Sequence, residues 1–130
     1  MQANDECYKQ FSQVLAEVQT LAKRIERICT YPIEVHQTPK ASKWGFYAKY
    51  EEDRAPKNFA YARKKQRAKC LRISTKEEWA TRAHVDGSRY CVAPKGWRGK
   101  PAAYMDMKQD DMKSFNEVAS ILAKVCRARI

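Results

Sequence analysis

The spacing of the apolar residues changes twice along this chain, and this change most constrains its fold. From residue 8 to residue 29 they recur at steps of three and four, and Pro32 follows. This is the spacing of an amphipathic helix that a proline ends. Between residues 44 and 73 apolar and polar residues alternate, as they do in strands, and from residue 112 to residue 126 the helical spacing returns. The chain therefore predicts helices at both ends of a sheet.

The alternating segments predict an antiparallel sheet of four or five strands. We expect strands in WGFYAKY, NFAYA, AKCLRIS, RYCVA and AAYMDM. The second and third of these are expected to form a hairpin that RKKQR joins. The expected buried face of this hairpin carries Phe59, Tyr61, Leu71 and Ile73, and Arg72 is expected on the opposite face.

A short helix is predicted in STKEEWATRAH, because Thr75 and Glu78 have the spacing of a capping box. Together these elements indicate an α+β fold. The length of 130 residues is typical of one domain. We expect it to consist of a helix over residues 1–31, a basic sheet region over 33–107 and an amphipathic helix over 110–129.

The N-terminal helix has two interpretations. Its apolar residues form three heptads, which are compatible with a coiled coil, so residues 8–29 are a candidate homodimer contact. The alternative is a helix that packs lengthwise on the sheet of its own chain. The sequence leaves both interpretations open.

The positive charge is confined to the middle of the chain. Residues 36–100 hold seventeen basic and six acidic side chains, a net charge of +11, which equals that of the whole chain. The segments on either side carry net charges of −1 and +1. Such a concentrated charge is typical of a surface that binds a polyanion.

Several classes of function lack their usual motifs. The four glycines are scattered and form neither a phosphate-binding loop nor a nucleophile elbow. The histidines, cysteines and acids do not have the spacing of a metal site, so we expect no catalytic residues, no metal and no cofactor. No apolar run approaches the roughly 20 residues that span a membrane. The polar N-terminus and the odd number of cysteines favour a cytoplasmic protein.

Aromatic residues lie among the basic ones in this middle region. Lysine and arginine neutralise phosphates, and exposed aromatic rings stack on unpaired bases. We expect Tyr47 or Trp97 to supply such a ring, because each stands beside basic residues. The candidate nucleic-acid contacts are Lys43, Tyr47, Lys49, Arg63, Lys64, Lys65, Arg67, Lys69, Arg72, Trp97, Arg98 and Lys100.

Three pieces of the chain resemble a known family. They are FYAKY, NFAYARKKQRAKCLRIS and GWRGKPAAYMDMKQDDMKSFNEVASIL, within about residues 44–125. They are similar to a small bacterial domain of unknown function that some genomes describe as a predicted transport protein. Several proteins carry that domain beside restriction or nuclease modules. The resemblance implies an α+β accessory domain near nucleic-acid chemistry and carries over no catalytic residue.

The leading hypothesis is a non-enzymatic domain that binds the phosphate backbone of DNA or RNA. The second is a phage or bacterial regulator whose basic surface binds an acidic protein or inhibits a nucleic-acid enzyme. A small enzyme is the third.

Overall fold

The computed structural model describes residues 2–37, 43–49, 58–65, 70–108 and 112–129. Side chains are described within 16–37, 43–49, 58–64, 70–108 and 113–128. The elements in chain order are α1 (Gln2–Cys29), β1 (Ile33–Gln37), β2 (Lys43–Ala48), β3 (Ala60–Lys65), β4 (Cys70–Lys76), α2 (Glu77–Arg82), the 3-10 turn η1 (Gly87–Arg89), β5 (Cys91–Trp97), β6 (Lys100–Lys108) and α3 (Met112–Arg129).

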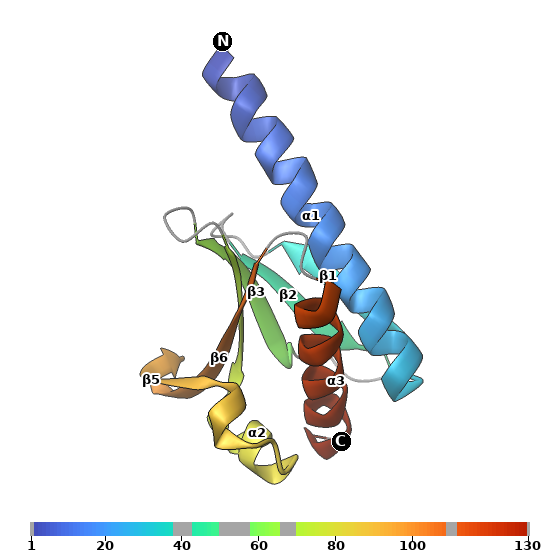
Figure 1. Ribbon diagram of the computed structural model, residues 1–130, viewed down its shortest axis with the longest axis vertical. Coiled ribbons are helices and arrows are strands. Elements are labelled where there is room, and N and C mark those ends of the chain that lie inside the picture. Colours follow the sequence, from blue (N-terminus) through green and yellow to red (C-terminus); the bar gives the residue numbers. More distant parts are fainter. Residues whose placement is uncertain (1, 38–42, 50–57, 66–69, 109–111, 130) are drawn as a thin grey trace.

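The strands form one antiparallel sheet with the order β1-β2-β3-β4-β6-β5. Helices α1 and α3 lie side by side on one face of this sheet, and α2 lies at one end, where it contacts α3, β6 and β4 (Figure 1). The α+β class predicted from the sequence is confirmed. The sheet has six strands, however, where four or five were expected.

The hydrophobic core lies between the sheet and the two long helices. Phe46 and Ile73 from the sheet and Leu21 and Leu122 from the helices are completely buried in it. Strand residues of one parity form this helix-side face. They are Ile33, Val35, Gln37, Trp44, Phe46, Ala48, Ala60, Ala62, Lys64, Leu71, Ile73, Thr75, Val92, Ala103, Met105 and Met107. The amphipathic pattern of the sequence is therefore satisfied by a single core.

The strand missed by the sequence analysis is β1. It follows Pro32 directly and pairs with β2 alone, so it is an edge strand. Only Ile33 is fully buried in it, while Glu34 and His36 occupy the other face. Five residues with two apolar side chains are too short for alternation to stand out from the preceding helix.

The expected buried face of the β3–β4 hairpin is partly wrong. Phe59, Leu71 and Ile73 are buried, but Tyr61 is half-buried on the opposite face of the sheet. Ala60 and Ala62 take the helix-side positions, directly across from Phe46 and Trp44 of β2. Small alanines there leave room for the two large rings of the neighbouring strand.

The capping box expected at Thr75 is also wrong. The N-cap of α2 is Lys76, and its side chain makes no capping hydrogen bond. Thr75 is the last helix-side position of β4, and it is fully buried. Its hydroxyl donates to the carbonyl oxygen of Phe59 at 2.7 Å. Because Thr75 is buried, its hydroxyl needs a partner within the core, and it bonds to this backbone carbonyl and does not cap the helix.

The second half of α1 packs into the hydrophobic core of its own chain. Val18, Ala22, Ile25 and Cys29 are buried, as expected for a helix that packs on its own chain. The first half extends beyond the sheet (Figure 1). None of the helices within the described residues is long and apolar enough to cross a membrane.

Candidate nucleic-acid interface

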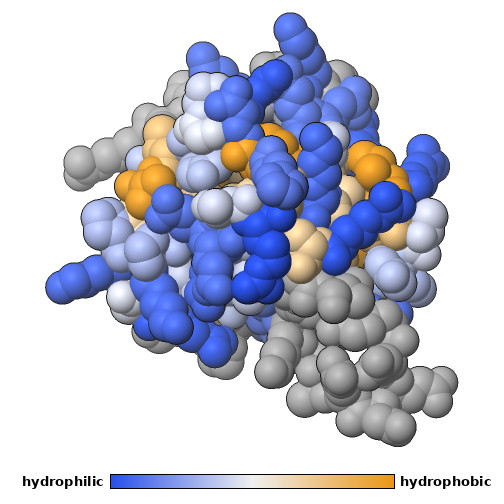
Figure 2. Space-filling view, turned by 90° about the horizontal axis from the view of Figure 1, so that it is seen from below, coloured by the Kyte–Doolittle hydropathy of each residue, from blue (hydrophilic) through white to orange (hydrophobic). Residues whose placement is uncertain are grey.

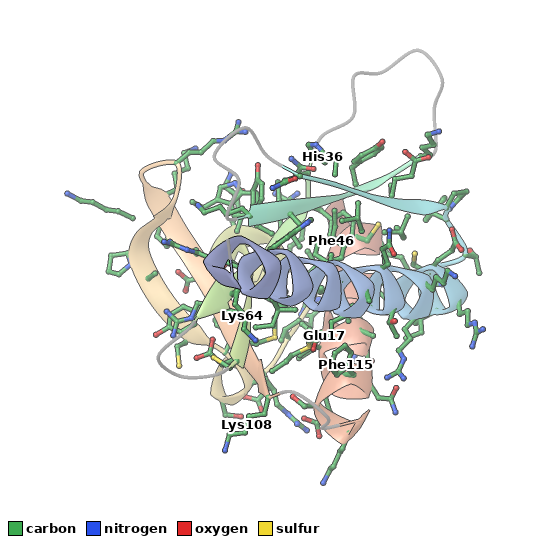
Figure 3. All side chains as sticks on the ribbon, turned by 90° about the horizontal axis from the view of Figure 1, so that it is seen from above. Glu17, His36, Phe46, Lys64, Lys108 and Phe115 are labelled. Atoms are coloured by element: carbon green, nitrogen blue, oxygen red, sulfur yellow. The ribbon has the colours of Figure 1, made fainter. Side chains whose placement is uncertain are left out.

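The candidate site is the face of the sheet that points away from α1 and α3. We call it the open face and define it by the strand residues opposite in parity to the helix-side face. In Figure 3, His36 of the open face and Phe46 of the helix-side face lie on opposite sides of the β1–β2 strands. The described open-face side chains are Glu34, His36, Lys43, Tyr47, Tyr61, Arg63, Cys70, Arg72, Ser74, Lys76, Cys91, Ala93, Trp97, Lys100, Ala102, Tyr104, Asp106 and Lys108.

Three cations stand directly beside one another across this face. Lys43 of β2 is the cross-strand neighbour of Arg63 on β3, and Arg63 is the neighbour of Arg72 on β4. We call Lys43, Arg63 and Arg72 the cation row. Asp106 of β6 ends the row beside Arg72. Like charges directly opposite one another destabilise a sheet. The three neighbouring positive charges are therefore unfavourable for folding, and Asp106 reduces their repulsion only at the Arg72 end.

The cations of the open face fall into two groups. Arg72 pairs with Asp106, Lys49 with Glu34 and Lys76 with Glu78. Lys43, Arg63, Lys100 and Lys108 form no ion pair with any residue in the described part of the chain, and the same holds for Arg98 at the border of the face. The second group is therefore available to an external anion without breaking an existing pair.

Arg72 is held flat by two neighbours. Its Nε and Nη2 donate to Oδ1 and Oδ2 of Asp106 at 2.8 and 2.9 Å. Its guanidinium carbon lies 4.2 Å from the centre of the Tyr104 ring. The hydrogen bonds to Asp106 raise the pKa of Arg72. A two-point pair on an aromatic ring fixes the plane of the guanidinium group.

A second cross-strand row lies next to the cation row. It consists of Gly45, Tyr61, Ser74 and Tyr104, on β2, β3, β4 and β6, and we call it the tyrosine row. Each member lies two residues along its strand from a member of the cation row or from Asp106. Two residues of a strand span about 7 Å. The open face thus places a row of charge and a row of rings side by side.

Tyr61 belongs to an aromatic cluster that is centred on Trp97. Its ring centre lies 5.0 Å from that of Trp97, which in turn lies 5.3 Å from that of Trp79. Asn58 Nδ2 donates to the Tyr61 hydroxyl at 3.2 Å, and the Arg98 guanidinium approaches the same oxygen at 3.5 Å. Gly45 leaves space for Asn58, because a Cβ atom at Gly45 would come within 2.6 Å of Asn58 Oδ1.

The turn between β5 and β6 brings Arg98 to this cluster. Trp97 pairs with Lys100, so Arg98 and Gly99 alone form the turn. Both have positive φ, 49° and 85°, which is the geometry of a type I′ turn. Asparagine and glycine normally occupy such positions, because a Cβ atom makes positive φ unfavourable. An arginine here suggests that the position serves something other than stability.

Tyr47 and Lys49 form a separate group around Glu34. The Tyr47 hydroxyl donates to Glu34 Oε2, and Lys49 Nζ lies 2.7 Å from Glu34 Oε1. The hydrogen bonds from Lys49 and Tyr47 lower the pKa of Glu34, and the bond to Glu34 raises the pKa of Tyr47. Tyr47 is half-buried, and its ring packs edge-on against His36 at 5.5 Å. Both predicted contacts are thus occupied within the chain.

An open cavity of about 430 Å³ adjoins the end of the sheet near Trp97. Lys100, the neighbour of Trp97, lines it together with Lys76, Glu77, Glu78, Thr81, Arg82 and Pro101. Glu78 pairs with both Lys76 and Arg82. The surface at the α2 end is mainly hydrophilic, with small separate hydrophobic areas (Figure 2).

The structure brings some of the predicted contacts together and separates others. Lys43, Arg63, Arg72, Trp97, Arg98 and Lys100 all lie on the open face or at its border. Lys64 does not, because it is the neighbour of Leu71 on the helix-side face. Arg67, Lys69 and the side chain of Lys65 lie outside the described residues.

Tyr61 and Tyr104 were not among the predicted contacts, although the structure places both in the tyrosine row. A signal for Tyr61 was present in the sequence. Arg63 and Lys65 have the same parity as Tyr61, and charged residues on one side of a strand indicate the exposed face.

No family model, curated protein or solved structure matches this chain. The interface is therefore interpreted from its own geometry.

Proposed function

We propose that the chain binds nucleic acid, DNA or RNA, through the open face of its sheet. The observation that carries this proposal is the cation row, in which Lys43, Arg63 and Arg72 stand as direct cross-strand neighbours. The mutual repulsion of these side chains is relieved when phosphates bind between them. Four of the open-face cations also lack an ion pair within the described residues, as noted above.

The position of the cations supports this proposal beyond the net charge of +11. A solvated charge would be stabilised best by dispersal or by pairing with acids. Here Arg63 is exposed and has a cation on each side. The Arg98 position adds a further cation at the cost of an unfavourable backbone conformation. Both arrangements favour an anion with regularly repeated charges.

The test is binding of fluorescent DNA and RNA oligonucleotides, followed by anisotropy at several salt concentrations. We expect log K to fall linearly with log salt for the wild-type protein. The double variant Lys43→Gln, Arg63→Gln should bind more weakly, and its salt slope should be smaller by about two. Lys113→Gln, Lys124→Gln is the matched control, because both lysines are exposed on α3 behind the sheet.

The control should bind almost as well as the wild-type protein. Equal losses in the two double variants would contradict the proposed face, because charge alone would then determine binding. Absence of binding to DNA and RNA at low salt would overturn the proposed function. An acidic protein would then be the partner to seek, by retention on the immobilised chain after nuclease treatment.

We also propose that α1 mediates homodimerisation. The expected contact over residues 8–29 has to be shortened, because Val18, Ala22 and the later heptad positions are buried in the core of their own chain. Two observations support a contact through the remaining part: the heptad spacing at Tyr8, Phe11 and Leu15, and the extension of the first half of α1 beyond the sheet (Figure 1). A dimer would present two open faces to one nucleic acid. Sedimentation equilibrium of the wild-type protein and of Phe11→Lys tests this idea. A wild-type protein that stays monomeric at high micromolar concentration would contradict it.

A further inference from the structure

The tyrosine row distinguishes between two classes of nucleic acid. In a duplex the bases are stacked within the double helix, and a protein surface meets mainly phosphates and groove edges. In a single strand each base is free to stack on an aromatic side chain. Rings beside the cations therefore offer a single strand contacts in addition to those with its phosphates, although within the chain Tyr61 already packs against Trp97 and its ring centre lies 6.0 Å from Lys43 Nζ.

The two rows have the arrangement that a single strand requires. Arg63 and Tyr61 lie on the same side of β3, and Arg72 and Ser74 lie on the same side of β4. The rows therefore run in parallel across the strands, about 7 Å apart. A nucleotide chain that crosses the strands with its phosphates over one row extends its bases over the other.

Ser74 gives a base access to the rings. It stands between Tyr61 and Tyr104 in the tyrosine row, and the two tyrosines are two strand spacings apart, about 9.5 Å. A flat ring in contact with groups on both sides needs about 7 Å between them. The short side chain of Ser74 lies at the floor of this interval. A long side chain there would compete with a base.

Arg72 takes a different role in this arrangement from the phosphate contact expected from the sequence. Asp106 already satisfies its Nε and Nη2 groups, and the guanidinium lies over Tyr104. The side chain of Arg72 is still 31% exposed. A planar, paired guanidinium that stays partly exposed suits stacking on a base better than neutralising a phosphate.

We propose that the open face binds single-stranded nucleic acid, with phosphates over Lys43 and Arg63 and unpaired bases against Tyr61, Trp97 and Arg72. This inference rests on the proposed function. It adds the class of ligand and assigns separate roles to the two rows. Trp97 belongs to the stacking group because its ring contacts Tyr61 and its neighbours Arg98 and Lys100 are cations.

The experiment compares a single-stranded 20-mer with its duplex at one salt concentration, for the wild-type protein and three variants. Tyr61→Leu removes a ring, Tyr61→Phe keeps it, and Ser74→Leu fills the interval between the tyrosines. We expect the wild-type protein to prefer the single strand. Tyr61→Leu should weaken single-strand binding by about 5- to 100-fold, the range for one stacked base.

The other variants separate stacking from folding. Tyr61→Phe should bind the single strand within about threefold of the wild-type protein, and Ser74→Leu should lose affinity without losing a ring. Duplex binding depends on the cations, so all variants should retain it, which also shows that the open face is folded. Tryptophan fluorescence should be quenched by the single strand, because Trp97 is within reach of a base.

Each failure has a distinct meaning. Equal affinity for duplex and single strand, or equal binding by Tyr61→Leu and Tyr61→Phe, would overturn the single-strand inference and leave the proposed function intact. Binding of neither form by the wild-type protein would instead remove the proposed function.

Discussion

The two faces of the sheet use the same strands under opposite physical conditions. On the helix-side face, Phe46, Ile73 and Met107 are almost completely buried, and each apolar side chain has apolar neighbours. On the open face, the cross-strand neighbours Lys43, Arg63 and Arg72 repel one another. The large apolar core therefore lies on one face, whereas the other face carries mainly charged, polar and aromatic side chains, many of them exposed or half-buried.

The exceptions on each face support this division. Among the described residues, Thr75 is the buried polar side chain of the helix-side face. Its hydroxyl donates a hydrogen bond to a backbone carbonyl, so this polar group is paired. On the open face, by contrast, only some cations have an acidic partner. A face selected for stability would have placed acids beside Arg63.

The largest change in stability is expected when an aromatic ring of the helix-side face is replaced. Phe46→Ala should lower the free energy of unfolding by about 3–5 kcal/mol, because it leaves a cavity beside Phe59 in a fully buried region. Lys43→Ala changes the same strand on the open face and should alter stability by less than about 0.5 kcal/mol. Urea denaturation followed by circular dichroism measures both. Similar losses would show that the open face also stabilises the fold.

The sequence predicted the fold class but not the phase of β3. Alternation gives Phe59 and Tyr61 the same parity, and their long apolar side chains predict that this side of the strand is buried. In the structure β3 begins at Ala60, and Phe59 is buried just before the strand. The face of β3 was decided by its neighbour β2, whose Phe46 and Trp44 fill the space above the alanines.

Part of the site also depends on pairing that the sequence does not specify. Arg72 and Asp106 are 34 residues apart and meet because β4 pairs with β6, which is not its successor in the chain. The tyrosine row depends on the same register. By contrast, the basic character of Arg63 and Arg98 was evident from local composition. Charge could be predicted, whereas its arrangement required the sheet.

The turn at Arg98 provides the next test. Arg98→Asn creates the Asn-Gly sequence that a type I′ turn prefers, so the variant should be more stable by about 0.5–1 kcal/mol, or roughly 4 °C in Tm. It also removes one open-face cation and should weaken nucleic-acid binding. Lys124→Gln is the control, because it removes an exposed cation of α3, away from this turn. A less stable Arg98→Asn would show that the bond to Tyr61 outweighs the backbone cost.

In the cation row, too, loss of a positive charge should increase stability and weaken nucleic-acid binding, with a smaller change in stability than at Arg98. Arg63→Gln removes the middle charge of the row, so the free energy of unfolding should rise by about 0.2–1 kcal/mol at low salt. High salt should reduce the gain, because exposed charges are screened. Thermal unfolding at two salt concentrations measures both effects. Destabilisation by Arg63→Gln would contradict the repulsion inferred for the row.

The smallest expected effect concerns the corner of the open face where Glu34 pairs with Lys49 and Tyr47. The direction in which its contribution to stability changes with pH can be tested. Hydrogen bonds from Lys49 and Tyr47 lower the pKa of Glu34 in the folded chain. Ionised Glu34 therefore stabilises the fold above the pKa of the unfolded chain, and this contribution is lost as pH falls through the lower, folded pKa. Glu34→Gln has no such proton to gain, so the difference in Tm between wild type and variant should shrink from neutral pH towards pH 3. A difference that stays constant over this range would show that Glu34 contributes through packing, and the corner would then resemble the helix-side face more than the cation row.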